Sequence, residues 1–167
     1  ALCTAVLDFA ADKDFGFSKF ISIGNKADVD EQDLLEYLHE DEDTKVIMIY
    51  LEELKRGPEF IEVVKQITSG YNRTPVLVIK SGTTSAGARA AASHTGALAG
   101  SEAVYDAIFE QSGIIRVESI NELFNFASVF AFKHESPLGK STRKVPTGNR
   151  VAIITNRSEE RRVGKSV

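Results

Sequence analysis

The sequence contains two short and almost wholly apolar runs, VIMIYL at residues 46–51 and PVLVIK at residues 75–80. Polar and apolar residues do not alternate in either run, and such continuous runs are typical of strands buried on both faces of a sheet. Residues 58–69, between the two runs, have the periodicity of an amphipathic helix. The two strands are therefore predicted to be parallel, because a helix between them carries the chain back to the edge of the sheet from which it started.

The alternation of strand and helix continues downstream of this unit. The pattern predicts a helix at residues 102–111, a short strand at 114–117 and a helix from Ser119 to about Phe132. Repeated alternation of this kind predicts an α/β domain, in which helices cover both faces of a parallel sheet. We expect a flavodoxin-like, doubly wound fold, with its ligand site beyond the carboxyl ends of the strands.

Upstream of residue 46, the alternation of strand and helix is less regular than it is downstream. Residues 1–11 have helical spacing, but no capping residue precedes them. Residues 20–23 predict a strand that ends at the turn Gly24-Asn25, and either Asp28 or Asp30 can cap the helix that follows.

Composition excludes several classes of protein. The formal net charge of the 167 residues is -4, which argues against nucleic acid or an anionic membrane surface as a partner, because both favour clusters of Lys and Arg. There is no apolar run of about 18 residues, the length that a membrane span needs. The only cysteine, Cys3, cannot form an internal disulfide, so we expect a cytoplasmic protein.

Four regions follow from the changes in pattern along the chain. We expect the flavodoxin-like domain to occupy residues 1–132. Residues 133–148 are rich in Pro, Gly, Lys, Ser and Thr and predict a linker. Residues 149–156 contain a new apolar run and predict the start of a further domain. Residues 157–167, RSEERRVGKSV, show no periodicity, and we expect a non-native tail there, the alternative being a short basic C-terminal tail.

A segment of small residues lies between Ser81 and Ser101. Almost all of its residues are Gly, Ala, Ser or Thr, so it can bury little apolar surface. A long loop after a buried strand is more often functional than idle, and it starts at the edge where we expect the ligand. The alternative is that residues 86–92 form a short surface helix and that the segment only connects two elements.

His94 is the chemically active residue of this segment. Its neighbours are too small to bury the imidazole, and a neutral imidazole is a nucleophile near physiological pH. His94 is therefore predicted to accept a phosphoryl group. His39, in an acidic stretch at a helix end, and His134, at the start of the linker, lack such surroundings and are interpreted as structural.

A phosphohistidine site needs a carboxylate to orient the ring and a cradle for the phosphate. Glu52 or Glu53, directly after the first apolar run, can accept a hydrogen bond from the ring nitrogen opposite the attacking one. Backbone N–H groups in glycine-rich turns and at helix N-termini bind phosphate. Gly96, Gly100 and the helix that begins near Ser101 fit this second role.

The segment SHTGALAGS at residues 93–101 resembles the phosphohistidine motif of the ADP-forming acyl-CoA synthetases, the acetate–CoA ligase family related to succinyl-CoA synthetase. Four further segments resemble that family in the same order: FSKF at 17–20, IGNKADVD at 23–30, YLE at 50–52 and KSG at 80–82. The resemblance extends over about residues 1–132.

The resemblance implies a relay in which acyl-CoA and phosphate exchange to acyl phosphate and CoA, and the acyl phosphate then phosphorylates His94. The phosphoryl group next passes to ADP on an ATP-grasp domain or subunit, with Mg²⁺ present. The resemblance also implies that Glu52 holds the ring of His94, and that a CoA-binding domain and a central strand precede Ala1. CoA and ATP would then be bound mainly outside this chain, which alone should be inactive, and the complete enzyme should be an oligomer.

Two other functions compete with this one. The first is the acyl-CoA-synthetase-like regulatory region of a protein lysine acetyltransferase, a reading that the intact motif around His94 makes less favourable. The second is a flavodoxin-like response or nucleotide-binding module, for which the loops show neither a GxGxxG nor a P-loop pattern.

Overall fold

The computed structural model describes residues 2–24, 26, 28–82 and 102–131, all of which belong to one compact unit, Ala1–Phe132. The predicted linker, the start of a further domain and the tail lie outside the described residues. The elements in chain order are α1 (Leu2–Asp12), α2 (Glu31–Glu40), β1 (Ile47–Leu51), α3 (Gly57–Thr68), β2 (Val76–Lys80), α5 (Glu102–Ser112), β3 (Ile115–Arg116) and α6 (Ile120–Ala131).

The three strands form one parallel sheet in the order β1-β2-β3. β1 pairs with β2 over five positions, from Ile47 opposite Val76 to Leu51 opposite Lys80. The shorter β3 pairs with β2 through Ile115, which lies opposite Leu77. β2 is therefore the central strand of the sheet, and all five of its residues are buried, as its continuous apolar run predicted.

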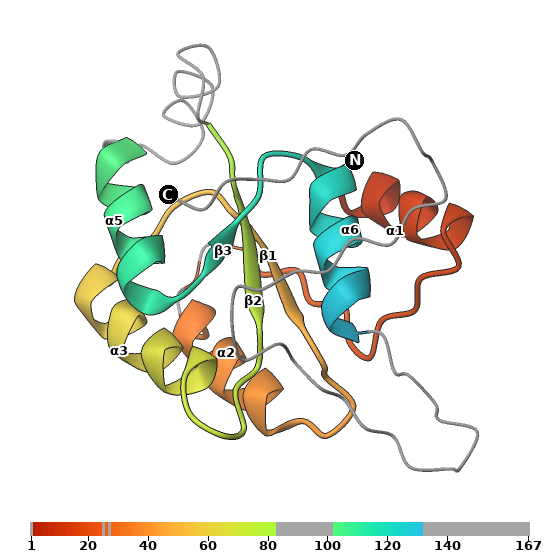
Figure 1. Ribbon diagram of the computed structural model, residues 1–167. Helices are drawn as coiled ribbons and strands as arrows, with labels where there is room; N and C mark the ends of the chain where they lie inside the picture. The colour runs from red at the N-terminus through yellow and green to blue at the C-terminus, as the bar shows by residue number, and fades with distance from the viewer. Residues whose placement is uncertain (1, 25, 27, 83–101, 132–167) are drawn as a thin grey trace, which may run out of the picture. The chain divides into compact units, whose positions relative to one another are not determined.

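Helices cover both faces of this sheet (Figure 1). Val76 and Val78 of β2 belong to a core that includes residues of α2, α3 and α5. Leu77 and Ile79 belong to a second core that contains Leu123 and other residues of α6. Alternate residues of a strand point to opposite faces, so one strand contributes to both cores. The predicted flavodoxin-like, doubly wound α/β fold is confirmed.

Aromatic rings attach α1 and the segment that follows it to α6. The ring of Phe124 on α6 lies 5.0 Å from that of Phe9 on α1 and 5.0 Å from that of Phe15. Phe17 contacts both Phe15 and Phe20, at 5.6 Å between ring centroids in each pair. Aromatic pairs at such distances add to the stabilisation that burial provides.

The strand predicted at residues 20–23 is not present. Among the described residues no strand pairs with this segment, and Phe20 and Ile21 are each 43% exposed. An apolar run can predict that a segment tends to be extended, but a strand forms only where a neighbour supplies backbone hydrogen bonds. This segment has no such neighbour in the described part of the chain, so it follows an irregular path.

The start of α2 resolves the choice between Asp28 and Asp30. The Asp30 carboxylate accepts hydrogen bonds from the backbone N–H groups of Gln32 and Asp33, and the Asp33 side chain accepts one from the Asp30 N–H. This reciprocal pair is a capping box, which satisfies backbone donors that the first helical turn leaves unpaired. Asp30 is therefore the cap.

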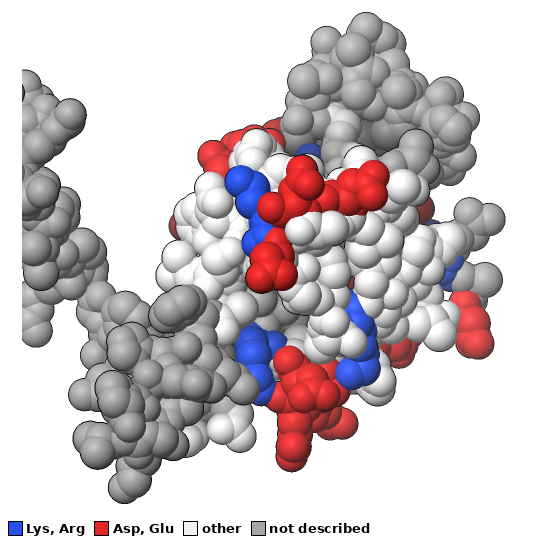
Figure 2. Space-filling model, turned by 90° about the vertical axis from the view of Figure 1, so that its right-hand side faces the viewer, with Lys and Arg blue, Asp and Glu red and all other residues white. Residues whose placement is uncertain are grey.

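No helix in the described part of the chain is long and apolar enough to cross a bilayer. The face seen in Figure 2 carries its Lys and Arg side chains in small groups beside Asp and Glu, with uncharged surface between them.

Candidate functional site

The carboxyl ends of the strands lie at one edge of the sheet, as they must in a parallel arrangement. Glu52 follows β1 at this edge, and Ser81 and Gly82 follow β2. Arg116, the last residue of β3, forms an ion pair with Glu102 in the first turn of α5, which places the start of α5 at the same edge. We call this region the carboxyl edge.

The segment that carries His94 is attached to the carboxyl edge at both ends, because the described chain stops at Gly82 and resumes at Glu102. Gly82 has a φ of 74°, a left-handed conformation that glycine adopts without strain. His94, Gly96, Gly100 and Ser101 themselves lie outside the described residues. Their meeting with Glu52 is therefore still a prediction.

Two lysines hold the peptide groups that follow β1. The Nζ atom of Lys80 donates a hydrogen bond to the backbone carbonyl of Glu52 at 2.8 Å, and Nζ of Lys26 donates one to the carbonyl of Glu53 at 2.8 Å. The residue Glu52 is exposed and Glu53 is half-buried. Of the two candidate carboxylates, Glu52 therefore belongs to the residue more open to solvent.

The next residues of the β1–α3 connection are also held by side chains. The backbone N–H of Leu54 donates to the Tyr105 hydroxyl of α5 at 3.2 Å, and the Arg56 carbonyl accepts from Nε2 of Gln32 at 3.5 Å. Arg56 also forms an ion pair with Asp30, the cap of α2. Side chains from three parts of the chain that are distant in sequence, residues 26–32, Lys80 and Tyr105, thus hold the connection between β1 and α3.

Lys80 is the most unusual group at the carboxyl edge. Lys80 is only 8% exposed, and its Nζ atom donates a second hydrogen bond, to the Ser81 carbonyl, at 2.6 Å. The ammonium lies 4.6 Å from the centre of the Tyr105 ring, which attracts a cation. Burial lowers the pKa of the Lys80 amine, an effect that the Glu102 carboxylate opposes.

Arg116 forms ion pairs with three nearby carboxylates. Its guanidinium is hydrogen-bonded to Glu102 and Asp106 on α5, and Glu118 lies 3.4 Å from Nε. Burial acts to lower the pKa of Arg116, but these hydrogen bonds outweigh burial and the pKa is raised. Arg116 therefore ties α5 to β3.

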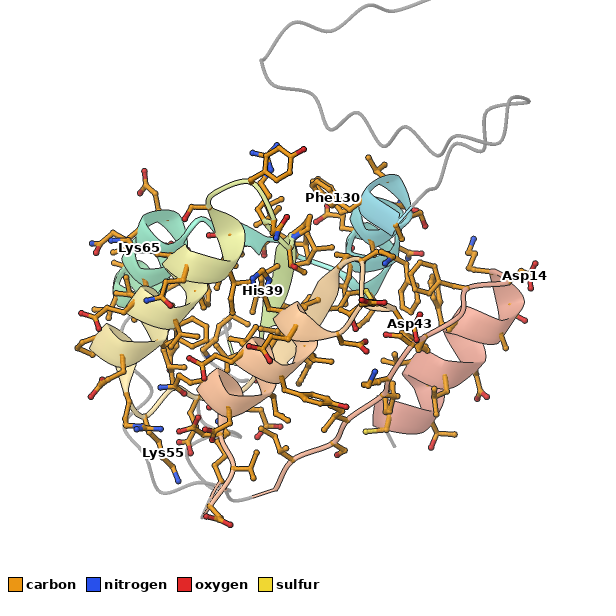
Figure 3. All side chains as sticks on the ribbon, turned by 90° about the horizontal axis from the view of Figure 1, so that it is seen from below. Asp14, His39, Asp43, Lys55, Lys65 and Phe130 are labelled. Carbon is orange, nitrogen blue, oxygen red and sulfur yellow. The ribbon has the colours of Figure 1, made fainter. Side chains whose placement is uncertain are left out.

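His39 lies at the opposite edge of the sheet. Its Nδ1 atom is 2.9 Å from the hydroxyl of Thr74, which precedes β2, and Figure 3 shows this histidine from below the sheet. The interpretation of His39 as structural agrees with this contact. His134 lies outside the described residues.

Three supporting residues, Lys26, Lys80 and Tyr105, have no role that the sequence alone predicts. A lysine at the end of a run that is otherwise apolar was a signal for Lys80, since lysine is rarely buried without a partner. Nothing in the sequence singles out Lys26 or Tyr105, because their contacts join residues 27 and 51 positions apart.

Known proteins of one family are similar to this chain. Residues 1–130 match the model of the family described as succinyl-CoA ligase like flavodoxin domain. The chain is 46% identical over 144 residues to the alpha subunit of ADP-forming acetate–CoA ligase II of Pyrococcus furiosus, an alignment that covers 86% of this chain and 28% of that protein. It is 42% identical over 156 residues to the ADP-forming 4-hydroxybutyrate–CoA ligase of Nitrosopumilus maritimus, with 93% of this chain and 21% of that protein covered.

A solved structure has the same fold. It is the dinucleotide forming acetyl-coenzyme A synthetase 1 of Candidatus Korarchaeum cryptofilum, in complex with phosphate and ADP. It superposes with a TM-score of 0.73 at 41% identity, over 81% of this chain and 29% of that one. The chain thus spans less than a third of the length of these proteins. The match to the family model over almost the whole described unit shows that the chain belongs to the family of succinyl-CoA ligase-like flavodoxin domains.

Proposed function

We propose that this chain is the phosphohistidine-bearing part of an ADP-forming acyl-CoA synthetase of the acetate–CoA ligase type. The observation that carries the proposal is the carboxyl edge, where both ends of the segment with His94 are attached and where Glu52 is held after β1. The ligase names of the relatives support the same activity.

The chemistry of the relay can be stated for the residues of this chain. Acyl-CoA and phosphate exchange to acyl phosphate and CoA outside it. One ring nitrogen of His94 then attacks the phosphorus of the acyl phosphate, so that an N–P bond forms, the P–O bond to the acyl group breaks and the carboxylate leaves. Glu52 accepts a hydrogen bond from the other ring nitrogen and stabilises the positive ring that attack creates.

The phosphate cradle and the second transfer complete the proposal. Backbone N–H groups at Gly96, Gly100 and Ser101, together with the N-terminus of α5, receive the phosphoryl oxygens. In the second transfer the N–P bond breaks and the phosphoryl group joins the terminal phosphate of ADP, which forms ATP. The reverse sequence activates a carboxylic acid.

We infer that the partners are a CoA-binding domain and an ATP-grasp domain or subunit, in a cytoplasmic enzyme that is oligomeric when complete. ATP or ADP and Mg²⁺ would be held mainly by the ATP-grasp part. Among the described residues, no group of three His, Cys, Asp or Glu side chains could hold a metal ion. The 167-residue chain alone should not turn over.

The relatives favour the ligase over the regulatory region of a lysine acetyltransferase. The Pyrococcus furiosus relative is named as a ligase subunit and the Nitrosopumilus maritimus relative as a ligase. These relatives are named for different acids, acetate and 4-hydroxybutyrate, so the proposal extends to carboxylic acids as a class.

The test is phosphorylation of the complete enzyme with radiolabelled ATP and Mg²⁺. The protein should acquire an acid-labile, alkali-stable label, and His94→Ala should remove both the label and the ligase reaction. His39→Ala is the matched control, because His39 lies at the opposite edge of the sheet. A wild-type level of label in the His94→Ala enzyme would contradict the mechanism and favour the regulatory alternative.

A further inference from the structure

The proposed relay leaves a buried cation at the carboxyl edge without a role. Lys80 is 8% exposed, and among the described residues no carboxylate lies within ion-pairing distance of its Nζ atom. A buried lysine without an ion pair is unfavourable for folding, because its ammonium loses its water. Lys26, by comparison, pairs with Glu31.

The hydrogen bonds of Lys80 connect two places that matter for the relay. Its ammonium donates to the carbonyl of Glu52, the first residue after β1, and to that of Ser81, the first residue after β2. Glu52 is the residue proposed to hold the ring of His94. Ser81 is the start of the small-residue segment that carries His94. One ammonium therefore joins the two strand ends beyond the last pair of the ladder, Leu51 opposite Lys80.

The contacts of the neighbouring residues reinforce this connection. Lys26 holds the carbonyl of Glu53, and the Tyr105 hydroxyl accepts from the N–H of Leu54. With Lys80 on Glu52, three consecutive residues each have a backbone group held by a side chain from outside the connection. Their peptide planes cannot rotate freely, so the direction in which the Glu52 side chain leaves the backbone is set.

A charged hydrogen-bond donor holds the carbonyl of Glu52 more firmly than a neutral donor would. Hydrogen bonds from an ammonium are roughly twice as strong as those between neutral groups. A carboxylate that has to orient an imidazole must be placed to within about 0.5 Å, which requires support for its backbone. An ammonium is therefore well suited to support the backbone of Glu52, although burial of the charge is unfavourable.

We propose that Lys80 is a positioning residue for phosphoryl transfer, whose ammonium holds the Glu52 and Ser81 carbonyls together so that the Glu52 carboxylate meets His94. This role rests on the proposed function of Glu52 and His94. In this role Lys80 acts through Glu52 and the backbone of Ser81.

The experiment measures the single-turnover rate at which ATP and Mg²⁺ phosphorylate the complete enzyme. Lys80→Met keeps the length and apolar stem of the side chain but removes the ammonium, and it should slow phosphorylation roughly 10–100-fold. Lys65→Met is the matched control, since Lys65 is an exposed lysine on α3 (Figure 3), and it should leave the rate unchanged. The melting temperature of Lys80→Met should stay within about 4 °C of wild type, because relief of the buried charge offsets the lost hydrogen bonds.

A double-mutant cycle separates positioning from a general effect on folding. If Lys80 acts through Glu52, Lys80→Met should slow the Glu52→Gln enzyme by much less than it slows wild type. A full, multiplicative loss in the double mutant would overturn the positioning role. If Lys80→Met does not fold, Lys80→Arg serves in the same cycle, since its planar guanidinium keeps the charge but presents its donors in a different geometry, which should displace the two carbonyls.

Different experimental results would overturn the proposed function and the positioning role of Lys80. An unlabelled wild-type enzyme would overturn the proposed function and this role with it. A labelled wild-type enzyme in which Lys80→Met reacts as fast as Lys65→Met would overturn the positioning role alone.

Discussion

Glu52 and Glu53 are adjacent carboxylates after the same strand, yet only one of them can be directed at the ring of His94. Successive side chains at a strand end point to opposite sides, and the backbone carbonyls of the two residues are held by different lysines, Lys80 and Lys26. The resemblance to the acyl-CoA synthetases selects the first carboxylate.

We therefore expect Glu52→Gln to slow phosphorylation of the complete enzyme roughly 10–100-fold, because the amide keeps the shape but loses the charge that favours a positive ring. Glu53→Gln should leave the rate close to that of wild type. Labelling rates of the two variants decide between the carboxylates, and the reverse order of effects would show that Glu53 faces the ring.

Asp30 caps α2 and also pairs with Arg56. Replacing it with Ala removes the acceptor for two backbone N–H groups and one ion-pair partner. We expect Asp30→Ala to lower the free energy of unfolding by about 1–2 kcal/mol. Denaturant unfolding measures this change, and an Asp28→Ala control should have a much smaller effect, since Asp30 provides the cap.

The charge of Asp30 gives its contribution a pH dependence. Burial acts to raise the pKa of its carboxyl, but the hydrogen bonds from Arg56 and from the backbone of α2 outweigh burial and hold the pKa below its ordinary value. A carboxyl whose pKa is lower in the folded state stabilises the fold above the unfolded pKa, and this contribution is lost as the pH falls through the folded pKa. The stability difference between wild type and Asp30→Asn should therefore be constant above about pH 5 and shrink below pH 4. A difference that stays constant down to pH 2 would contradict this assignment.

At the scale of elements, the end of α5 depends on one glycine. Gly113 has a φ of 71°, and the N–H of the next residue, Ile114, bonds back to the carbonyl of Phe109 at 3.0 Å. A left-handed glycine followed by such a bond is a common way to end a helix. Thr68 of α3 lies against this turn, and its hydroxyl donates to the Ser112 carbonyl at 2.8 Å.

Gly113→Ala should be destabilising for two reasons. The left-handed backbone is unfavourable for alanine, and an added Cβ would lie 2.9 Å from the Thr68 hydroxyl oxygen. We expect a loss of about 1–3 kcal/mol in the free energy of unfolding. Gly16→Ala is the control, because nothing lies within 4 Å of a Cβ at that position. Equal effects of the two substitutions would show that the turn is not strained.

At the scale of the whole molecule, β1 leaves one side of its backbone without a described partner. Ile47 and Leu51 bond toward β2, through Pro75 and Ser81. Alternate residues of a strand bond to opposite sides, so the backbone groups of Met48 face away from β2. The resemblance implies a central strand from the upstream part of the protein. We expect that strand to pair with this side of β1 and with residues 20–23.

We therefore expect the 167-residue chain alone to be only marginally stable, and a longer chain that includes the upstream domain to melt at a higher temperature. The physical reason is that the backbone groups at an unpaired sheet edge lack hydrogen-bond partners in the protein. The apolar side chains beside that edge are also left exposed to water. Thermal unfolding of both chains tests this, and amide exchange should show protection of residues 20–23 only in the longer one. Cooperative unfolding of the short chain at high temperature as a monomer would contradict the prediction.

The sequence by itself determined the elements whose signals are local. Continuous apolar runs predicted β1 and β2, and helical periodicity predicted α3, α5 and α6 to within a few residues. From these followed the parallel sheet, the doubly wound fold and the edge at which Glu52 lies. His94 and its phosphate cradle came from residue types and spacing, and they are still predictions.

Only the tertiary structure decided which side chains support the carboxyl edge and which apolar segment fails to become a strand. The hydrogen bonds of Lys26 and Lys80 to the backbone join residues 27 and 28 positions apart, and that of Tyr105 spans 51 positions. Residues 20–23 satisfy the pattern of a strand but have no neighbour to bond in the described chain. A local pattern reports the burial and periodicity of a segment, whereas contacts of this range exist only once several elements have packed together and brought the partners within hydrogen-bonding distance.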